Sequence, residues 1–288
     1  MASITANGIT IEYETAGDPA DPTLLLVMGL GGQLTAWDDE LVERLVKRGF
    51  YVVRHDNRDV GRSTWFDDAG VPDVLAAMEG KAQATYLLSD MADDAASLLG
   101  ALGIGSAHVL GVSMGGMIVQ SMAIRHPAIV KAMISVMSTT GAHSVGQPHP
   151  EAIQALLAPP PADRDAALDT AAKVWRVIGS PGFPFDEARV RRVAGAAYDR
   201  AFHPEGTARQ MVAILSSPDR TPGLRSVECP TFVVHGEDDP LVDPSGGRAT
   251  ADAVPGAQLW MVPGMGHDLP PQLFAEVVER IGAHCLGA

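Results

Sequence analysis

The segment that most constrains this chain is a serine flanked by glycines at the junction of two apolar elements. The pentapeptide GVSMG, centred on Ser113, follows an apolar run at 106–110 that predicts a strand. It precedes 116–125, which predicts a helix with one apolar face. This pattern is typical of a nucleophile elbow, a turn so tight that the serine backbone is strained. A side chain on either glycine would collide with the neighbouring strand or helix, so the pattern predicts an exposed serine hydroxyl above a helix N-terminus.

Two loops later in the chain carry groups that can activate a serine, which needs a base and a group that orients the base. The strand-like run 231–235 leads into GEDDP, residues 236–240, and the run 259–262 leads into PGMGH, which ends at His267. Sites in open α/β sheets form at the carboxyl ends of strands, so we expect both loops to meet Ser113. The order along the chain is serine, acid, histidine, unlike the order in chymotrypsin or subtilisin.

Several motifs of the chain resemble those of the α/β-hydrolase superfamily. GVSMG, GEDDP and PGMGH match its serine, acid and histidine segments, and DNRDVGRS, residues 56–63, resembles its DxRxxGxS segment. The N-terminal half, through DPADPTLLLVMG and RHDNRD, looks most like bacterial esterases of the aclacinomycin methylesterase type. The resemblance covers nearly the whole chain except its middle. It implies an α/β-hydrolase fold of class α/β, with a mostly parallel sheet, helices on both faces and a helical cap insertion.

The same resemblance assigns a role to each candidate catalytic residue. Ser113 is the nucleophile, His267 is the general base and then the general acid, and Asp239 holds the imidazole. Asp239 is favoured as the acid because it immediately precedes a proline, as the family's aspartate often does. Three other carboxylates lie within reach in sequence and remain alternatives for the acid: Glu237, Asp238 and Asp243.

The expected oxyanion hole combines two backbone amides. One is the N–H of Met114, the residue after the serine, and the other comes from the loop after an early strand at 23–27. That loop reads MGLGG, residues 28–32, where many relatives have His-Gly at the start. This difference from the relatives should have little effect on the oxyanion hole, because the donor is a backbone N–H and Gly29 is kept. By resemblance the second donor is the N–H of Leu30.

Composition and charge limit the partners of the chain. Its 288 residues, 46% hydrophobic and 19% charged, suffice for one large α/β domain with an insertion. No apolar run approaches the about 18 residues of a membrane span, and the N-terminal segment lacks the features of a signal peptide, so we expect a cytoplasmic location. A net charge of −14 argues against nucleic acid as a partner. Cys229 and Cys285 are too few and too far apart for a metal site or a disulfide framework, and no cofactor or metal is expected.

Strand-like and helix-like segments alternate along much of the chain. An N-terminal hairpin precedes the strand 23–27, a helix near 38–48, the strand 51–56, a helix from about 86 to 102 and the strand 130–138. Such alternation predicts a largely parallel sheet covered on both faces. From 139 to 226 the chain shows only helical segments broken by proline clusters. We therefore expect core segments at 1–138 and 227–288, with a helical cap at 139–226 over the site.

The large apolar residues of this insertion have two expected places, the core of the cap or the wall of a pocket. Core is the default expectation for each, because such residues usually sit inside. They are Leu156, Leu157, Val174, Trp175, Val177, Ile178, Phe183, Phe185, Met211 and Ile214.

The expected reaction is hydrolysis of a carboxylic ester, in which Ser113 attacks the acyl carbonyl and water releases the acid from an acyl-enzyme. Serine at the elbow, where dehalogenases and epoxide hydrolases carry aspartate, argues against those two activities. The same triad supports a C–C bond hydrolase, a lactonase or a perhydrolase, and a non-catalytic ligand-binding homologue is a further alternative. The mostly apolar insertion predicts a small-molecule ester with an apolar acyl or alcohol group. The oligomeric state stays open.

Overall fold

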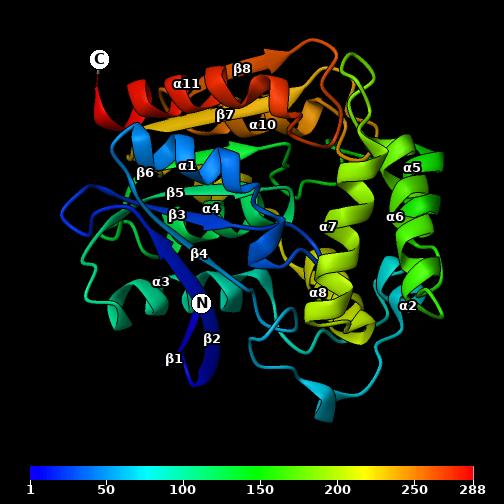
Figure 1. Ribbon diagram of the computed structural model, residues 1–288. Coiled ribbons are helices and arrows are strands. Elements are labelled where there is room, and N and C mark those ends of the chain that lie inside the picture. The colour runs from blue at the N-terminus through cyan, green and yellow to red at the C-terminus, as the bar shows by residue number, and fades with distance from the viewer. Residues whose placement is uncertain (288) are drawn as a thin grey trace.

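The computed structural model describes residues 1–287 and is built around one mixed β-sheet (Figure 1). Of the expected second core segment, 227–288, residue 288 lies outside the described part. Within the described part the sheet has eight strands, in the order β1-β2-β4-β3-β5-β6-β7-β8. The pairs β1–β2 and β2–β4 are antiparallel, and all the others are parallel, which confirms the mostly parallel sheet. The strands are β1 (Ala2–Ala6), β2 (Ile9–Ala16), β3 (Thr23–Val27), β4 (Tyr51–His55), β5 (Ala107–Val112), β6 (Val130–Val136), β7 (Thr231–Gly236) and β8 (Gln258–Val262).

Core helices cover both faces of the sheet, each with its own apolar cluster. On one face, α1 and α11 pack with Leu45 and Phe274 against the strands; on the other, α3 and α4 pack with Leu98 and Ile118. Helix α1 begins after Asp38, whose side chain accepts a backbone N–H and so caps the first turn. The helices outside residues 139–226 are α1 (Asp39–Lys47), α2 (Val74–Met78), α3 (Leu88–Ala101), α4 (Met114–Arg125), α10 (Ser245–Ala253) and α11 (Phe274–Leu286), with the short 3₁₀ helices η1 (Leu34–Ala36), η2 (Asp67–Ala69) and η3 (Pro271–Leu273). Of these, α2 packs on α8 (Pro204–Ser216) of the segment 139–226.

The boundaries predicted from apolar runs agree with these elements to within two residues, and one difference is informative. The strand predicted at 106–110 extends to Val112, and the helix predicted at 116–125 already begins at Met114. The glycines that the sequence suggests as a loop lie inside the strand and the helix. A side chain has no room at either position, because α4 packs closely on β5 at Gly111 and on β3 at Gly115. Ser113 is therefore the only residue between the end of β5 and the start of α4.

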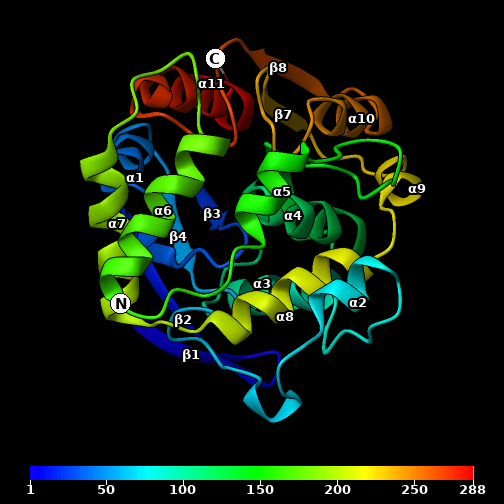
Figure 2. The ribbon, with the colours of Figure 1, turned by 90° about the vertical axis from the view of Figure 1, so that its right-hand side faces the viewer.

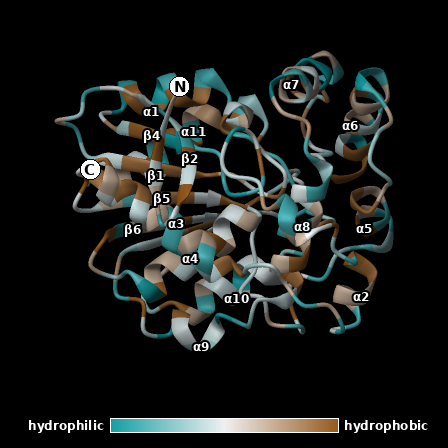
Figure 3. Cartoon of the chain, turned by 90° about the horizontal axis from the view of Figure 1, so that it is seen from below, coloured by the Kyte–Doolittle hydropathy of each residue, from teal (hydrophilic) through white to brown (hydrophobic). Residues whose placement is uncertain are grey.

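Between β6 and β7 the chain leaves the sheet and forms a group of helices beside the ends of the strands (Figures 1 and 2). Two of these helices begin at aspartate N-caps, Asp163 and Asp186, whose side chains accept N–H groups of the first turn. Figure 3 shows that these helices carry both polar and apolar residues. We call them the insertion helices: α5 (Pro150–Leu156), α6 (Arg164–Ile178), α7 (Glu187–Arg200), α8 (Pro204–Ser216) and α9 (Thr221–Leu224).

Buried ion pairs attach the insertion helices to the segment that follows β4. From α8, Arg209 pairs with Asp59 at 2.8 Å, and both side chains are almost completely buried. From α7, Arg200 pairs with Asp56 at 2.7 Å. Because a buried charge that loses its partner is costly, these two pairs fix how α7 and α8 sit on the core.

Candidate active site

Ser113 forms the turn between β5 and α4, and its backbone is strained. Its φ of 55° and ψ of −120° lie where residues other than glycine are rare. A Cβ on Gly111 would overlap the carbonyl of Gly115, and a Cβ on Gly115 would overlap the carbonyl of Val27. The predicted collision at both glycines is therefore confirmed. Close packing of β3, β5 and α4 holds the serine in this conformation.

We expect Gly115→Ala to lower the free energy of unfolding by about 3 kcal/mol, because the added methyl must push apart the backbones of α4 and β3. Gly100→Ala is the matched control, since Gly100 also lies in a helix, α3, but a Cβ there meets nothing within 4 Å. The control is expected to stabilise the protein by about 0.5–1 kcal/mol, because alanine favours a helix more than glycine does. Urea denaturation measures both changes. Similar small changes in the two variants would contradict the crowding at the elbow.

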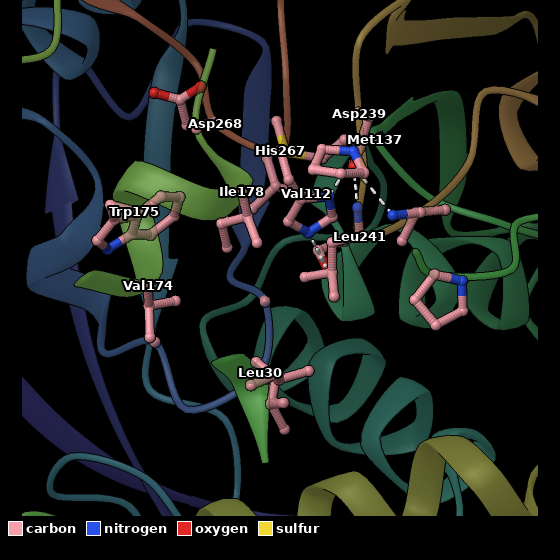
Figure 4. Close-up of a pocket in the computed structure, with 18 of the residues that line it drawn as sticks. Leu30, Val112, Met137, Val174, Trp175, Ile178, Asp239, Leu241, His267 and Asp268 are labelled. Carbon is pink, nitrogen blue, oxygen red and sulfur yellow. Dashed lines mark hydrogen bonds and ion pairs between the residues drawn. The ribbon is translucent and has the colours of Figure 1, made fainter. Parts of the chain in front are cut away.

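Three side chains from loops at the ends of parallel strands form one hydrogen-bonded chain. Ser113 follows β5, Asp239 lies after β7 and His267 lies after β8. Nδ1 of His267 lies 2.8 Å from Oδ2 of Asp239, and Nε2 of His267 lies 2.9 Å from Oγ of Ser113. His267 is 5% exposed and Asp239 is 1% exposed. The structure brings together the three residues that the sequence predicts, and Figure 4 shows His267 and Asp239 side by side.

Asp239 is surrounded by hydrogen-bond donors. Its Oδ1 accepts the N–H groups of Leu241 and Val242, each at 2.9 Å. Its Oδ2 faces His267 and also Nε2 of His235, at 3.4 Å. Burial disfavours the charged carboxylate, but the two imidazoles and the Val242 N–H outweigh burial and hold the pKa of Asp239 well below its usual range. Asp239 is therefore an anion that can accept a hydrogen bond from His267.

His235 is a part of this site that the sequence pattern does not single out. It lies in β7, is fully buried, and its Nε2 lies 2.8 Å from the carbonyl oxygen of Val242. A carbonyl only accepts, so Nε2 carries the proton and its N–H also points toward Asp239. The sequence signal is its position four residues before Asp239, across the turn that ends the strand.

Of the three carboxylates that remained alternatives for the acid, two have other partners and the third is exposed. Asp238 accepts the N–H of Gly264 at 2.9 Å, and Asp243 accepts the N–H of Ser245 at 2.9 Å. Glu237 is exposed. Within the described residues, no hydrogen bond joins any of the three to the histidine of the site.

Asp268 is the sequence neighbour of His267 but turns away from its ring. Its carboxylate accepts a hydrogen bond from the Ser180 hydroxyl. Figure 4 shows it on the opposite side of His267 from Asp239. Burial raises the pKa of Asp268, so its charge is less favoured than that of Asp239. Of these two carboxylates, only Asp239 lies at hydrogen-bond distance from the imidazole of His267.

Two backbone amides beside the serine are left without partners. Across residues 1–287, no hydrogen bond is formed by the N–H of Leu30 or the N–H of Met114. The Leu30 loop touches the serine, since a Cβ on Gly29 would lie 3.2 Å from Cβ of Ser113. The Met114 N–H lies at the start of α4, where a helix N-terminus favours negative charge. These are the two amides that the sequence predicts for an oxyanion hole.

A cavity of about 1950 Å³ lies between the core and the insertion helices. Ser113, His267 and Leu30 line it, and most of its lining from the insertion is apolar. Nine of the ten apolar insertion residues expected in the core line this cavity, and Leu157 does not. The expectation of core is wrong for most of them, because α5, α6 and α7 enclose a space instead of packing onto the sheet. Figure 4 shows one of the nine, Trp175, at the wall.

Metal clusters and membrane-spanning helices are absent from the described part of the chain. Residues 1–287 hold no group of three or more His, Cys, Asp or Glu side chains arranged to bind a metal ion. No helix in this range is both long enough and apolar enough to cross a membrane. Cys229 and Cys285 are free thiols, and burial raises the pKa of Cys285 to about 12, so this thiol stays protonated.

Comparison with known proteins relates nearly the whole chain to hydrolases. Residues 22–271 match a family described as alpha/beta hydrolase fold. The chain is 30% identical to rhodomycin D methylesterase DauP of Streptomyces sp. (strain C5), over 99% of this chain and 98% of that protein. It is equally identical, over the same shares, to rhodomycin D methylesterase DnrP of Streptomyces peucetius. A bifunctional esterase/perhydrolase, DCH of Acinetobacter calcoaceticus, is 27% identical over 92% of each chain.

Solved structures share the fold at lower identity. The enol-lactonase from Burkholderia xenovorans superposes with a TM-score of 0.76 at 22% identity, covering 97% of this chain and 98% of that one. Its likeness concerns the arrangement of helices and strands, as the eight-stranded sheet described above would suggest. With a family match over residues 22–271 and relatives 30% identical along almost their full length, this chain belongs to the α/β-hydrolase family.

Proposed function

We propose that this α/β-hydrolase cleaves carboxylic esters. Ser113 is the nucleophile, His267 is the general base and then the general acid, and Asp239 is the carboxylate that orients the imidazole of His267. The observation that carries the proposal is the continuous chain of hydrogen bonds from Asp239 through His267 to the Ser113 hydroxyl. It gives the serine a base and gives the base an orienting carboxylate. The names of two relatives, which describe methylesterases, support the same class of reaction.

The first half of the proposed reaction follows from proton positions in the site. Asp239 is ionised, so Nδ1 of His267 carries the proton and Nε2 is left to accept one. As Oγ of Ser113 attacks the ester carbonyl, its proton moves to Nε2 of His267. The carbonyl oxygen becomes an oxyanion that accepts the N–H groups of Leu30 and Met114.

The second half returns the site to its starting state. Collapse of the tetrahedral intermediate breaks the bond to the alcohol, which leaves with the proton from His267. The acyl group is then esterified to Ser113. Water, deprotonated by His267, attacks this acyl-enzyme, and the acid leaves as Ser113 regains its proton. Each proton taken by the histidine is thus given back, and no other reactant is needed.

We propose further that residues 139–226 form a cap and that 1–138 and 227–288 form the core, with the substrate bound between them. The ion pairs of Arg200 and Arg209 with the core support a cap that is docked at a fixed place. The volume of the cavity and its mostly apolar lining support a bulky, apolar small-molecule ester as substrate.

A fluorophosphonate is expected to add once, to the peptide that contains Ser113, as mass spectrometry of a digest would show.

We expect kcat/KM for p-nitrophenyl esters to rise with the length of the acyl chain, by up to about fourfold per methylene from acetate to hexanoate. Each added methylene leaves water for the apolar wall of the cavity. Initial rates over a concentration series for each ester measure the profile. A flat profile would refute the apolar substrate, whereas fluorophosphonate labelling without turnover of any ester would refute ester hydrolysis.

A further inference from the structure

The loop that carries the Leu30 amide is held at both ends by local contacts. Within residues 28–32, the N–H of Gly32 donates to the carbonyl of Gly29 at 3.1 Å. From the segment after β4, Nδ2 of Asn57 donates to the carbonyl of Met28 at 3.0 Å. Neither bond involves the peptide between Leu30 and Gly31, so the N–H of Gly31 needs an acceptor from outside the loop.

Gln210, a residue of the insertion helix α8, supplies that partner. Its Oε1 accepts the N–H of Gly31 at 2.9 Å, and its Nε2 donates to the carbonyl of Arg58 at 2.7 Å. Gln210 is 0% exposed and its bond to Arg58 is buried, whereas its bond to the half-buried Gly31 lies at the edge of the cavity. Since 179 residues separate Gln210 from Gly31, the bond exists only when α8 is docked on the core.

Neighbouring contacts fix α8 at this point. Arg209, the residue before Gln210, forms the buried ion pair with Asp59. Thr207, one turn earlier, packs on Gly31, where a Cβ would lie 3.0 Å from its hydroxyl oxygen. Gly31 has a φ of +65°, which glycine adopts without strain. The loop and the helix are therefore matched in shape as well as in hydrogen bonding.

We infer that Gln210 is a positioning residue through which the insertion aims the Leu30 N–H at the oxyanion, an inference that rests on the proposed function. The peptide bonded to Gln210 and the peptide that carries the Leu30 N–H share the Cα of Leu30. A fixed Gly31 N–H limits rotation at this Cα and so fixes the direction of the neighbouring amide. Without Gln210, the half-buried Gly31 N–H loses its acceptor among the described residues, and its peptide is no longer held in one orientation.

Gln210→Met tests this role, because methionine has a similar length and cannot form either hydrogen bond. We expect kcat for p-nitrophenyl esters to fall by about 10- to 100-fold while KM changes by less than about threefold, since an oxyanion donor acts mainly in the transition state. The affinity for a trifluoromethyl ketone, whose serine adduct carries an oxyanion, is expected to fall by the same factor. Hydrogen exchange at the Gly31 amide should become faster.

Gln33→Met is the matched control. Gln33 follows the same loop and is also buried, and its Nε2 donates to the carbonyls of Ala197 and Ala201 at 2.8 and 2.7 Å. Its Oε1 accepts a hydrogen bond from Nη1 of Arg200 at 2.7 Å. Gln33 makes no hydrogen bond to Gly31 and does not itself line the cavity, although Ala197 does. We expect this variant to lose thermal stability while kcat stays within about threefold of the wild-type value. An equal loss of kcat in both variants would mean that general docking of the insertion matters, and would overturn the specific role of Gln210.

Gln210→Glu is a second variant that keeps the shape of the side chain. When protonated, its carboxyl can accept from Gly31 and donate to the carbonyl of Arg58, as the amide does. When ionised it only accepts, so its kcat relative to wild type is expected to rise as the pH falls from about 8 to about 6. Wild-type kcat in both variants at all pH values would overturn the inference. Wild-type protein that neither hydrolyses esters nor binds the ketone would instead refute the proposed function, and the inference with it.

Discussion

Ser113→Ala is expected to lower kcat/KM for p-nitrophenyl esters by about 10⁴- to 10⁶-fold. Alanine keeps the Cβ and removes the one atom that the proposed mechanism makes nucleophilic, the Oγ that lies 2.9 Å from Nε2 of His267. What remains is binding in the cavity and stabilisation of the oxyanion by backbone amides, which the substitution does not touch. Steady-state rates with purified protein, and the loss of fluorophosphonate labelling, measure the effect.

Ser121→Ala is the control for this substitution. Ser121 lies on α4, the helix that follows Ser113, it is buried, and its hydroxyl donates to the carbonyl of Met117 at 3.0 Å within the helix. Its removal should leave ester hydrolysis unchanged. Ser113→Ala should not unfold the protein, because alanine and serine pay a similar cost for the positive φ of the elbow. Activity that persists above about one tenth of wild type in Ser113→Ala would place the nucleophile elsewhere.

The sheet and the elbow could be predicted because each of their sequence patterns is compatible with only one local structure. All five residues of β3, Thr23–Val27, are buried and apolar or β-branched, as expected for a central parallel strand. At the elbow, the glycines on either side of Ser113 are demanded by the overlap that any Cβ would make with backbone. Steric limits of this kind act over a few residues, so a short segment of sequence records them.

The wall of the cavity and the supports of the site could not be predicted, because they depend on how distant segments meet. Trp175 and its apolar neighbours on α6 have the spacing of a helix face whether that face packs on a sheet or borders a void. The bond from Gly31 to Gln210 and the contact of His235 with Asp239 depend on where α8 and the end of β7 lie in space. A lone glutamine in a sequence carries no sign of such a neighbour, and the spacing of His235 and Asp239 does not by itself show that their side chains meet.

Asp239→Asn is expected to lower kcat by about 10⁴-fold, because it places the proton on the wrong nitrogen of His267. In the wild type, the carboxylate keeps the proton on Nδ1 and leaves Nε2 to accept one from Ser113. An amide NH₂ facing Nδ1 requires Nδ1 to accept, so the proton moves to Nε2. Nε2 then has no lone pair for the serine proton. Steady-state rates with the same esters measure the loss.

Turning the amide around does not restore the site, because every partner of Asp239 is a donor. On one side are the N–H groups of Leu241 and Val242, and on the other are the imidazoles of His235 and His267. Four donors around one group suit a carboxylate, whose two oxygens only accept, and leave no place for an NH₂. The substitution is therefore expected to destabilise the fold as well as to slow catalysis.

Asp238→Asn makes the same chemical change at the adjacent residue and so shows which of the two carboxylates activity depends on. Asp238 is exposed, and an asparagine oxygen can still accept the N–H of Gly264. Its kcat should stay within about threefold of wild type. A large loss in Asp238→Asn together with wild-type activity in Asp239→Asn would transfer the acid role to the earlier residue.

The charge of Asp239 also determines how the stability loss in Asp239→Asn should vary with pH. Because its pKa in the folded protein lies well below its usual range, the unfolded chain binds this proton more readily than the folded one. The stability that its charge contributes is therefore present above about pH 4 and is lost as the pH falls through the lower, folded pKa. Denaturation with urea should show the largest difference between wild type and Asp239→Asn near neutral pH, and a smaller one at about pH 3. An equal difference at both pH values would mean that the donors around this side chain do not stabilise its charge, which would remove the basis for its role in orienting His267.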